Sequence, residues 1–158
     1  MKILLTYYSR TRVTAGVAKA ISQKLNCDVE EIKDTKDRSG AIKYLTSCID
    51  ALRETPTVIE PIDKDILEYD LVIVGSPVWA ATMANPVLAY LTENKDKFKE
   101  LAFFCTCSSS GYEKTIAKME EITGKSGIAK LFMTKTDIDS SFDVKVDEFI
   151  ENINEKNV

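Results

Sequence analysis

The feature that most constrains the fold of this chain is a regular alternation of short apolar runs with segments whose apolar residues recur at helical spacing. The run at residues 71–74 is continuous, as in a parallel strand buried on both faces. Four other segments also read as strands, and a helical pattern follows each of the five. The strands are expected at residues 2–8, 27–32, 71–74, 101–105 and 128–133. This alternation predicts an α/β fold with three layers, in which helices cover both faces of a five-stranded parallel sheet.

The expected helices have recognisable apolar faces and end signals. The second helix is amphipathic, and Asn85 is suited to be the N-cap of the third, with Pro86 at its first helical position. Gly124 is suited to close the fourth helix. The apolar face of the second helix consists of Ile42, Leu45, Ile49 and Leu52.

Size and composition limit the classes of function. A chain of 158 residues is expected to form one domain, residues 1–158, and its net charge of -4 leaves no basic excess for nucleic acid or an anionic membrane. There is no histidine, and the four cysteines form no C-x-x-C pair, so we expect no metal site. Without a signal-peptide pattern or a long apolar span, we expect a cytoplasmic protein.

Three loops should converge on one point. In a sheet of this kind, the ligand lies beyond the carboxyl ends of the strands, where successive crossovers leave on opposite faces. The loops expected there are residues 9–14, 75–85 and 106–112, and they have the most unusual chemistry in the chain. We therefore expect the functional site to be built from these three segments.

The first loop is hydroxylic and cationic. The hydroxyls of Ser9, Thr11 and Thr14 lie near the first turn of a helix, where free N–H groups await an acceptor such as a phosphate. The alternative is that one hydroxyl only caps the helix while Arg10 and Arg12 are solvated. The first loop alone favours neither interpretation.

The other two loops add a possible aromatic platform. Trp79 follows a buried strand and could stack on a planar ligand, or it could pack over the end of the sheet as part of the core. The third loop has short side chains and exposed amides, with Tyr112 as a second possible ring wall, although an ordinary turn would look similar. Together, the three loops indicate a site for a phosphorylated planar ligand.

Two stretches of the chain resemble flavodoxins of the short-chain form. Residues 8–14 are similar to the phosphate loop of that family, and residues 69–79, with residues 83–87 after them, resemble flavodoxin-related and quinone-reductase-related sequences. The resemblance covers essentially the whole chain. It implies the flavodoxin-like strand order 2-1-3-4-5 and flavin mononucleotide (FMN) bound at the switch point; flavodoxin is itself the standard example of this order and site.

The resemblance also implies roles for individual residues. The flavin supplies the redox chemistry, so no side chain needs to act as an acid, a base or a nucleophile, and we expect no catalytic residue. The implied phosphate-binding residues are Ser9, Arg10, Thr11, Arg12, Val13 and Thr14; the ring-lining residues are Pro77, Val78, Trp79, Ala80, Ala81 and Thr82; and the residues at the pyrimidine edge are Thr106, Cys107, Ser108, Gly111 and Tyr112.

This sequence departs from the family pattern at two places. Arg12 stands where the family usually has glycine, and because a residue with a Cβ resists positive φ, we expect a different loop path, with Arg10 and Arg12 compensating by charge. Ala80 and Ala81 stand where a small residue, often glycine, lets the peptide flip towards the reduced ring. Since alanine flips less readily to positive φ, we expect a less stabilised one-electron-reduced flavin.

The leading hypothesis for function is an FMN-binding redox protein that exchanges electrons with partner proteins or with a small quinone-like acceptor. An NAD(P)H-dependent quinone-type reductase is one alternative, and a flavodoxin-fold binding module without flavin is another. A phosphatase or receiver-like domain would need an acidic cluster or an attacking cysteine at the strand ends. Cys107 is the only candidate for that cysteine, and its loop lacks the expected arginine and glycines.

Overall fold

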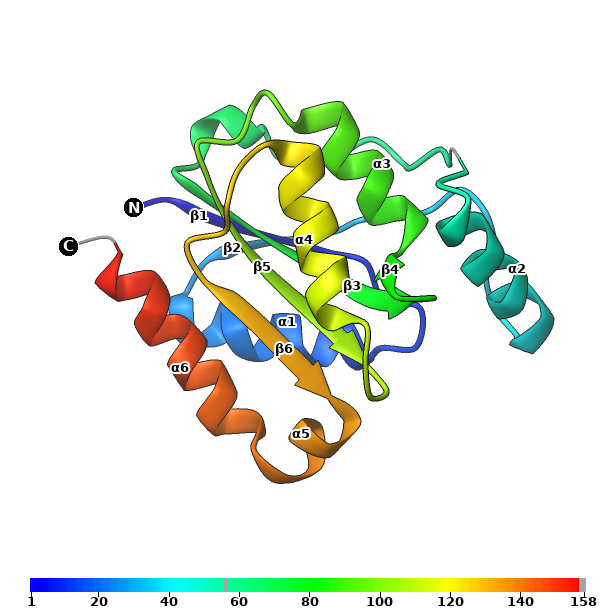
Figure 1. Cartoon of the computed structure of the whole chain (residues 1–158). Helices are drawn as coiled ribbons and strands as arrows, with labels where there is room; N and C mark the ends of the chain where they lie inside the picture. Colours follow the sequence, from blue (N-terminus) through cyan, green and yellow to red (C-terminus); the bar gives the residue numbers. More distant parts are fainter. Residues whose placement is uncertain (56, 157–158) are drawn as a thin grey trace.

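A parallel sheet lies at the centre of the computed structural model, which describes residues 1–55 and 57–156 (Figure 1). Its strands are adjacent in the order β2-β1-β3-β5-β6. Because a short β4 pairs antiparallel with the end of β3, this is the expected order 2-1-3-4-5 counted without β4. The strands are β1 (Ile3–Tyr7), β2 (Asp28–Glu31), β3 (Leu71–Trp79), β4 (Thr82–Met83), β5 (Glu100–Cys107) and β6 (Lys130–Thr134).

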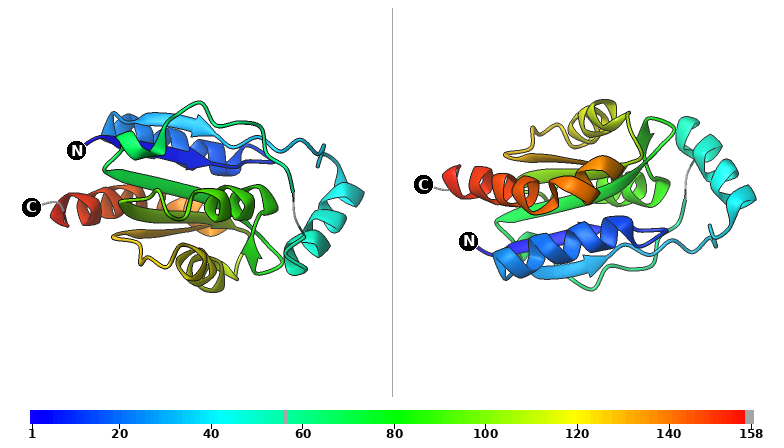
Figure 2. Two further views of the ribbon diagram at one scale, coloured as in Figure 1. Left: turned by 90° about the horizontal axis from the view of Figure 1, so that it is seen from above. Right: turned by 90° about the horizontal axis from the view of Figure 1, so that it is seen from below.

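Helices cover both faces of the sheet. On one face, α1 (Val13–Leu25) and α6 (Phe142–Glu155) pack over alternate strand residues such as Leu5 and Ile73. On the other, α3 (Asn85–Asn94) and α4 (Tyr112–Thr123) pack over residues such as Val72. Figure 1 shows these helices on the two sides of the sheet, and in Figure 2, which views the molecule from above and below, the N-terminus and the end of α6 lie on the side opposite α2 (Ala41–Leu52). The continuous apolar run of β3 is therefore buried on both sides, as its sequence predicts.

Strand β3 is longer than the apolar run that predicts it. It continues through Gly75 and Pro77 to Trp79, and then folds back on β4 through a two-residue turn. A glycine is needed at position 75 for β3 to lie beside β5. A Cβ there would lie 2.0 Å from Cζ of the buried Phe104 on β5. The prediction that residues 75–85 form an open loop is therefore wrong for most of the segment.

Of the two helix-end signals read from the sequence, the structure corrects one and confirms the other. Ala84 is the N-cap of α3, and Asn85 is already helical; its side chain instead donates a hydrogen bond to the Thr55 carbonyl at 2.8 Å. The predicted N-cap is therefore off by one residue. Gly124 closes α4 in the left-handed conformation, as expected. The structure also adds a short 3-10 helix, η1 (Ile66–Glu68), and a short helix, α5 (Lys135–Ser140), that the sequence analysis did not anticipate.

Helix α2 turns its apolar side outward. A buried cluster lies beneath it, in which Arg38 pairs with Asp34 at 2.5 Å and donates to the Ser47 hydroxyl of α2 at 3.0 Å. Because this polar cluster holds Ser47 inward, the opposite side of the helix faces solvent. The residues on that side are Ile42, Leu45, Ile49 and Leu52, which are 83%, 66%, 42% and 65% exposed.

Among the described residues, no helix has the length and apolar character needed to cross a membrane. The longest helix, α6, has 14 residues and carries several charges. The structure therefore offers no membrane-spanning helix in residues 1–55 and 57–156.

Candidate functional site

A pocket of about 510 Å³ lies at the carboxyl ends of β1, β3, β5 and β6. It sits at the point where the strand order reverses, between β1 and β3. Its volume is typical of a small-molecule site. The lining residues are Arg10, Thr11, Val13, Thr14, Tyr44, Pro77, Val78, Trp79, Thr106, Cys107, Ser108, Lys135, Ile138 and Asp139.

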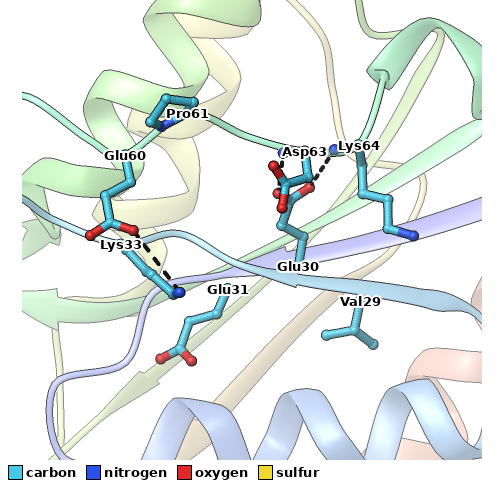
Figure 3. A pocket seen from close by; sticks show the side chains of 8 residues that line it. All are labelled: Val29, Glu30, Glu31, Lys33, Glu60, Pro61, Asp63 and Lys64. Atoms are coloured by element: carbon cyan, nitrogen blue, oxygen red, sulfur yellow. Dashed lines mark hydrogen bonds and ion pairs between the residues drawn. The ribbon is translucent and has the colours of Figure 1, made fainter.

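A second hollow, of about 530 Å³, lies beside the edge strand β2 (Figure 3). Several of its polar groups have partners within the chain: the Glu30 carboxylate accepts hydrogen bonds from the N–H groups of Asp63 and Lys64, and Lys33 lies 4.0 Å from Glu60. These contacts hold the following segment against the edge of the sheet. The hollow gathers neither hydroxyls nor aromatic rings, so the pocket at the strand ends is the better candidate site.

The first predicted loop forms the turn that leads into α1. Ser9 Oγ accepts a hydrogen bond from the Ala15 N–H at 3.2 Å, while the buried hydroxyls of Thr14 and Thr106 hydrogen-bond to each other at 2.8 Å. Within the described chain, the N–H groups of Val13 and Thr14 at the first helical turn have no acceptor. Ser9 therefore caps the helix, as the alternative interpretation holds, and two amides remain available to an anion.

Arg12 takes the conformation expected of glycine. Its φ is 68° and its ψ is -2°, in the left-handed region, so the expectation that its Cβ would divert the loop is wrong. The side chain is 80% exposed and points to Glu31, with 3.8 Å between the charged atoms. Arg12 does not line the pocket, and the structure therefore gives it no part in compensating a charge there.

Arg10 does line the pocket, and its guanidinium lies 4.4 Å from the ring centroid of Tyr44 on α2. Lys135 and Asp139, which are contributed by α5, also line the pocket. Within residues 1–55 and 57–156, these three charged groups form no ion pair. The pocket thus has two cations and one carboxylate that are free to meet a ligand.

Trp79 lies inside the core. It is only 2% exposed, because Tyr8 and Tyr44 make edge contacts at 5.5 Å and 6.3 Å between centroids, and Arg38 lies 5.7 Å from the ring. The expectation that Trp79 leaves the core is therefore wrong, although it forms part of the pocket wall. Tyr44 is the aromatic ring that lies nearer to the surface of the pocket, and burial raises its pKa.

The turn between β3 and β4 places Ala80 and Ala81 at φ values of 50° and 61°. Two consecutive positive φ values define the type I′ turn that suits a two-residue hairpin. Both alanines therefore already hold the backbone conformation that they were expected to resist. Gly111 of the third loop packs on this turn, since a Cβ there would lie 2.9 Å from the Ala81 Cα. Ala80, Ala81, Thr82 and Gly111 support the pocket wall without lining it.

The third loop contributes less than expected. Thr106, Cys107 and Ser108 line the pocket, but the ring of Tyr112 packs on Phe132, with 4.8 Å between centroids, outside the pocket lining. Burial raises the pKa of the Cys107 thiol, and the negative charge of Asp137 raises it further. The thiol therefore stays protonated at neutral pH and is unsuited to act as a nucleophile.

Four lining residues were missed by the sequence analysis: Tyr44, Lys135, Ile138 and Asp139. Tyr44 lies on the side of α2 opposite the apolar residues that suggested the helix. The α5 residues follow a capping box in which the Thr134 hydroxyl accepts from the Asp137 N–H, while the Asp137 carboxylate accepts from the Thr134 N–H. That Thr-x-x-Asp pattern is a readable helix-start signal and could have revealed α5.

Comparisons with known proteins match the chain to a family and its fold to solved structures. A family model described as flavodoxin matches residues 2–152, whereas no curated protein sequence matches the chain. An FMN-bound flavoprotein from Lactobacillus acidophilus NCFM has a similar structure, with 24% identity and a TM-score of 0.73 over 87% of this chain and 96% of that one. An FMN-bound flavodoxin from Fusobacterium nucleatum has 12% identity and a TM-score of 0.63 over 98% of each chain. Oxidised Flavodoxin 2 from Bacillus cereus has 17% identity and a TM-score of 0.62 over 99% of each chain.

Proposed function

The chain belongs to the flavodoxin family, and on that premise we propose that it is a redox protein that binds FMN in the pocket at the carboxyl ends of the strands. Bound flavin would supply the electron-transfer chemistry, while the protein supplies position and electrostatics. The observation that carries the proposal is that amides, the Thr11 hydroxyl and two cations, all without a hydrogen-bond or ion-pair partner among the described residues, meet an aromatic ring in one pocket at the switch point.

The donor set fits a phosphate. The free amides of Val13 and Thr14 point from the first turn of α1, where the helix dipole also favours an anion. The Thr11 hydroxyl and the cations of Arg10 and Lys135 line the same pocket. In this proposal, these five groups hold the phosphate, and Asp139 accepts hydrogen bonds from the hydroxyls of the ribityl chain.

The wall for the ring is built from Pro77, Val78 and Tyr44 on one side and Thr106 to Ser108 on the other. The apolar side chains keep water from the ring, and the turn at Ala80 and Ala81 holds the wall in place. No side chain in this pocket is positioned as a nucleophile. In this proposal, the electron acceptor is a partner protein or a small quinone-like molecule that approaches the flavin.

A direct test is the absorption spectrum of the purified protein before and after addition of FMN and removal of excess ligand. We expect a bound flavin spectrum with a stoichiometry of one per chain. Protein that stays colourless after incubation with FMN would instead be a binding module that has lost flavin. The NAD(P)H-dependent alternative is checked on the loaded protein, by whether NADPH alone bleaches the flavin.

The two arginines of the first loop can be compared by mutation, because Arg10 lines the pocket and Arg12 does not. Arg10→Ala removes a charge that lines the pocket, and loss of one charge-assisted hydrogen bond of about 1.5–3 kcal/mol weakens binding about 10- to 100-fold. Arg12→Gly removes a charge that points to Glu31, and glycine accepts positive φ without strain, so its FMN affinity is expected to be unchanged or higher.

The measurement is the dissociation constant of FMN at low and high salt for both variants, by quenching of flavin fluorescence. Arg10→Ala should also flatten the salt dependence, because screening acts on the charge that it removes. An equal loss of affinity in both variants would show that Arg12 contributes to the phosphate site after all. No loss in Arg10→Ala would remove Arg10 from it.

A further inference from the structure

The exposed aliphatic side of α2 is a feature that the proposed function leaves unused. We define the α2 face as Ile42, Leu45, Ile49 and Leu52, which are 83%, 66%, 42% and 65% exposed. The spacing of these residues, three, four and three, repeats that of the a and d positions of a heptad. In Figures 1 and 2, α2 lies at the edge of the molecule, on the side away from the N-terminus and from the end of α6.

This exposure differs from that of scattered surface residues. Single exposed aliphatic residues are normal on soluble proteins, whereas a contiguous row marks an interaction surface. The side of α2 that faces the protein instead carries small and polar residues such as Ser47 and Ala51, both buried. The most apolar side of α2 therefore faces away from the rest of this chain.

The acidic side chains around the α2 face form ion pairs within the chain. Asp37 pairs with Lys43, Asp50 lies 3.4 Å from Arg38, and Glu54 lies 3.0 Å from Lys118. The chain as a whole carries a net charge of -4, so two copies repel each other in general. At the α2 face the acidic groups are neutralised, and this is where two copies can meet without that repulsion.

We propose that the α2 face binds the α2 face of a second copy of this chain across a two-fold axis. An isologous contact needs a self-complementary patch, and this one qualifies in either orientation. In an antiparallel pair, Ile42 meets Leu52 of the other copy, and Leu45 meets Ile49. In a parallel pair, isoleucine meets isoleucine and leucine meets leucine, the arrangement that suits two-stranded packing.

The size of the patch sets the strength of the association. The four residues together expose the equivalent of about two and a half whole aliphatic residues, which places the patch within the roughly 300–600 Å² of a functional surface patch. Two such patches bury on the order of 600–1,200 Å², below the roughly 1,600 Å² of a standard stable interface. The dimer is therefore reversible and depends on protein concentration.

Sedimentation of the full chain over about a hundredfold range of concentration, up to about 1 mM, tests the proposal. The expected mass rises from 17.7 kDa at low concentration towards twice that value. Leu45→Glu places a charge in the centre of the α2 face and should weaken the dimer at least about tenfold, since burying an unpaired carboxylate is unfavourable. Leu67→Glu is the matched control, because Leu67 is 57% exposed on η1, outside the face, and should leave the dimer intact.

A second variant of the α2 face distinguishes loss of the dimer from a folding defect. Ile42→Glu lies in the first turn of α2, where a carboxylate is favourable to the helix, and Ile42 is the most exposed residue of the face. Both face variants are expected to keep the wild-type circular dichroism spectrum. A wild-type protein that stays monomeric over the whole range, or a dimer that survives both face variants, overturns the proposal. The outcome does not depend on FMN, since the α2 face lies outside the pocket.

Discussion

Replacing Arg38 by alanine is expected to lower the free energy of unfolding by about 3–5 kcal/mol, because it leaves a buried carboxylate without its counter-ion. Arg38 is 6% exposed and the Asp34 side chain is 2% exposed, with 2.5 Å between the paired atoms. Arg38 also donates to the Ser47 hydroxyl and lies over the Trp79 ring. Removal of the Arg38 side chain is therefore expected to loosen both α2 and the wall of the pocket.

Urea unfolding followed by circular dichroism measures this effect. Arg53→Ala is the control, since Arg53 is an exposed arginine at the end of α2 and its removal should change stability by less than about 0.5 kcal/mol. The double variant Arg38→Met with Asp34→Asn should regain part of the loss, because both charges are then gone. A single variant Arg38→Ala as stable as Arg53→Ala would contradict the structural role given to this ion pair.

Replacing Gly75 by alanine is expected to destabilise the protein by about 3 kcal/mol or more, the upper part of the range for overpacking a core. The added Cβ would lie 2.0 Å from Cζ and 2.3 Å from Cε1 of Phe104, whose ring is fully buried between the sheet and its helices. Neither group can move without shifting β3 against β5, which are paired at this level. The same shift would displace Pro77 and Val78 in the pocket wall.

Gly16→Ala provides the comparison for this prediction. Nothing lies within 4 Å of a Cβ at Gly16, which sits within α1, so alanine there should stabilise the protein by about 0.5–1 kcal/mol. Thermal unfolding of the two variants should then shift in opposite directions. Partial recovery in Gly75→Ala with Phe104→Leu would identify the ring contact as the cause. Equal melting temperatures for wild type and Gly75→Ala would refute the clash.

The sheet and its order could be predicted because the decisive signals are local. A continuous apolar run such as residues 71–74 suits only a position buried on both faces, and short connections between strands and helices leave few topologies. The three loops at the carboxyl ends could be predicted to converge for the same reason. Ten of the residues expected around the ligand do line one pocket, including Arg10, Thr14 and Thr106.

The features that could not be predicted depend on contacts between segments that are distant in the sequence. The outward turn of α2 follows from Arg38 and Asp34, which precede the helix, and no periodicity in residues 41–52 reveals it. Burial of Trp79 likewise follows from Tyr8 and Tyr44. Residue preference alone disfavours positive φ at Arg12, but the surrounding turn overrides that preference.

The affinity of the protein for FMN relative to riboflavin tests the central claim most directly, since the two ligands differ only in the phosphate. Several charge-assisted hydrogen bonds from Arg10, Lys135 and the first turn of α1 are each worth about 1.5–3 kcal/mol, so FMN is expected to bind at least about 100-fold more tightly. Equal affinities for the two ligands, or no binding of either, would contradict the assignment of this pocket as a flavin phosphate site.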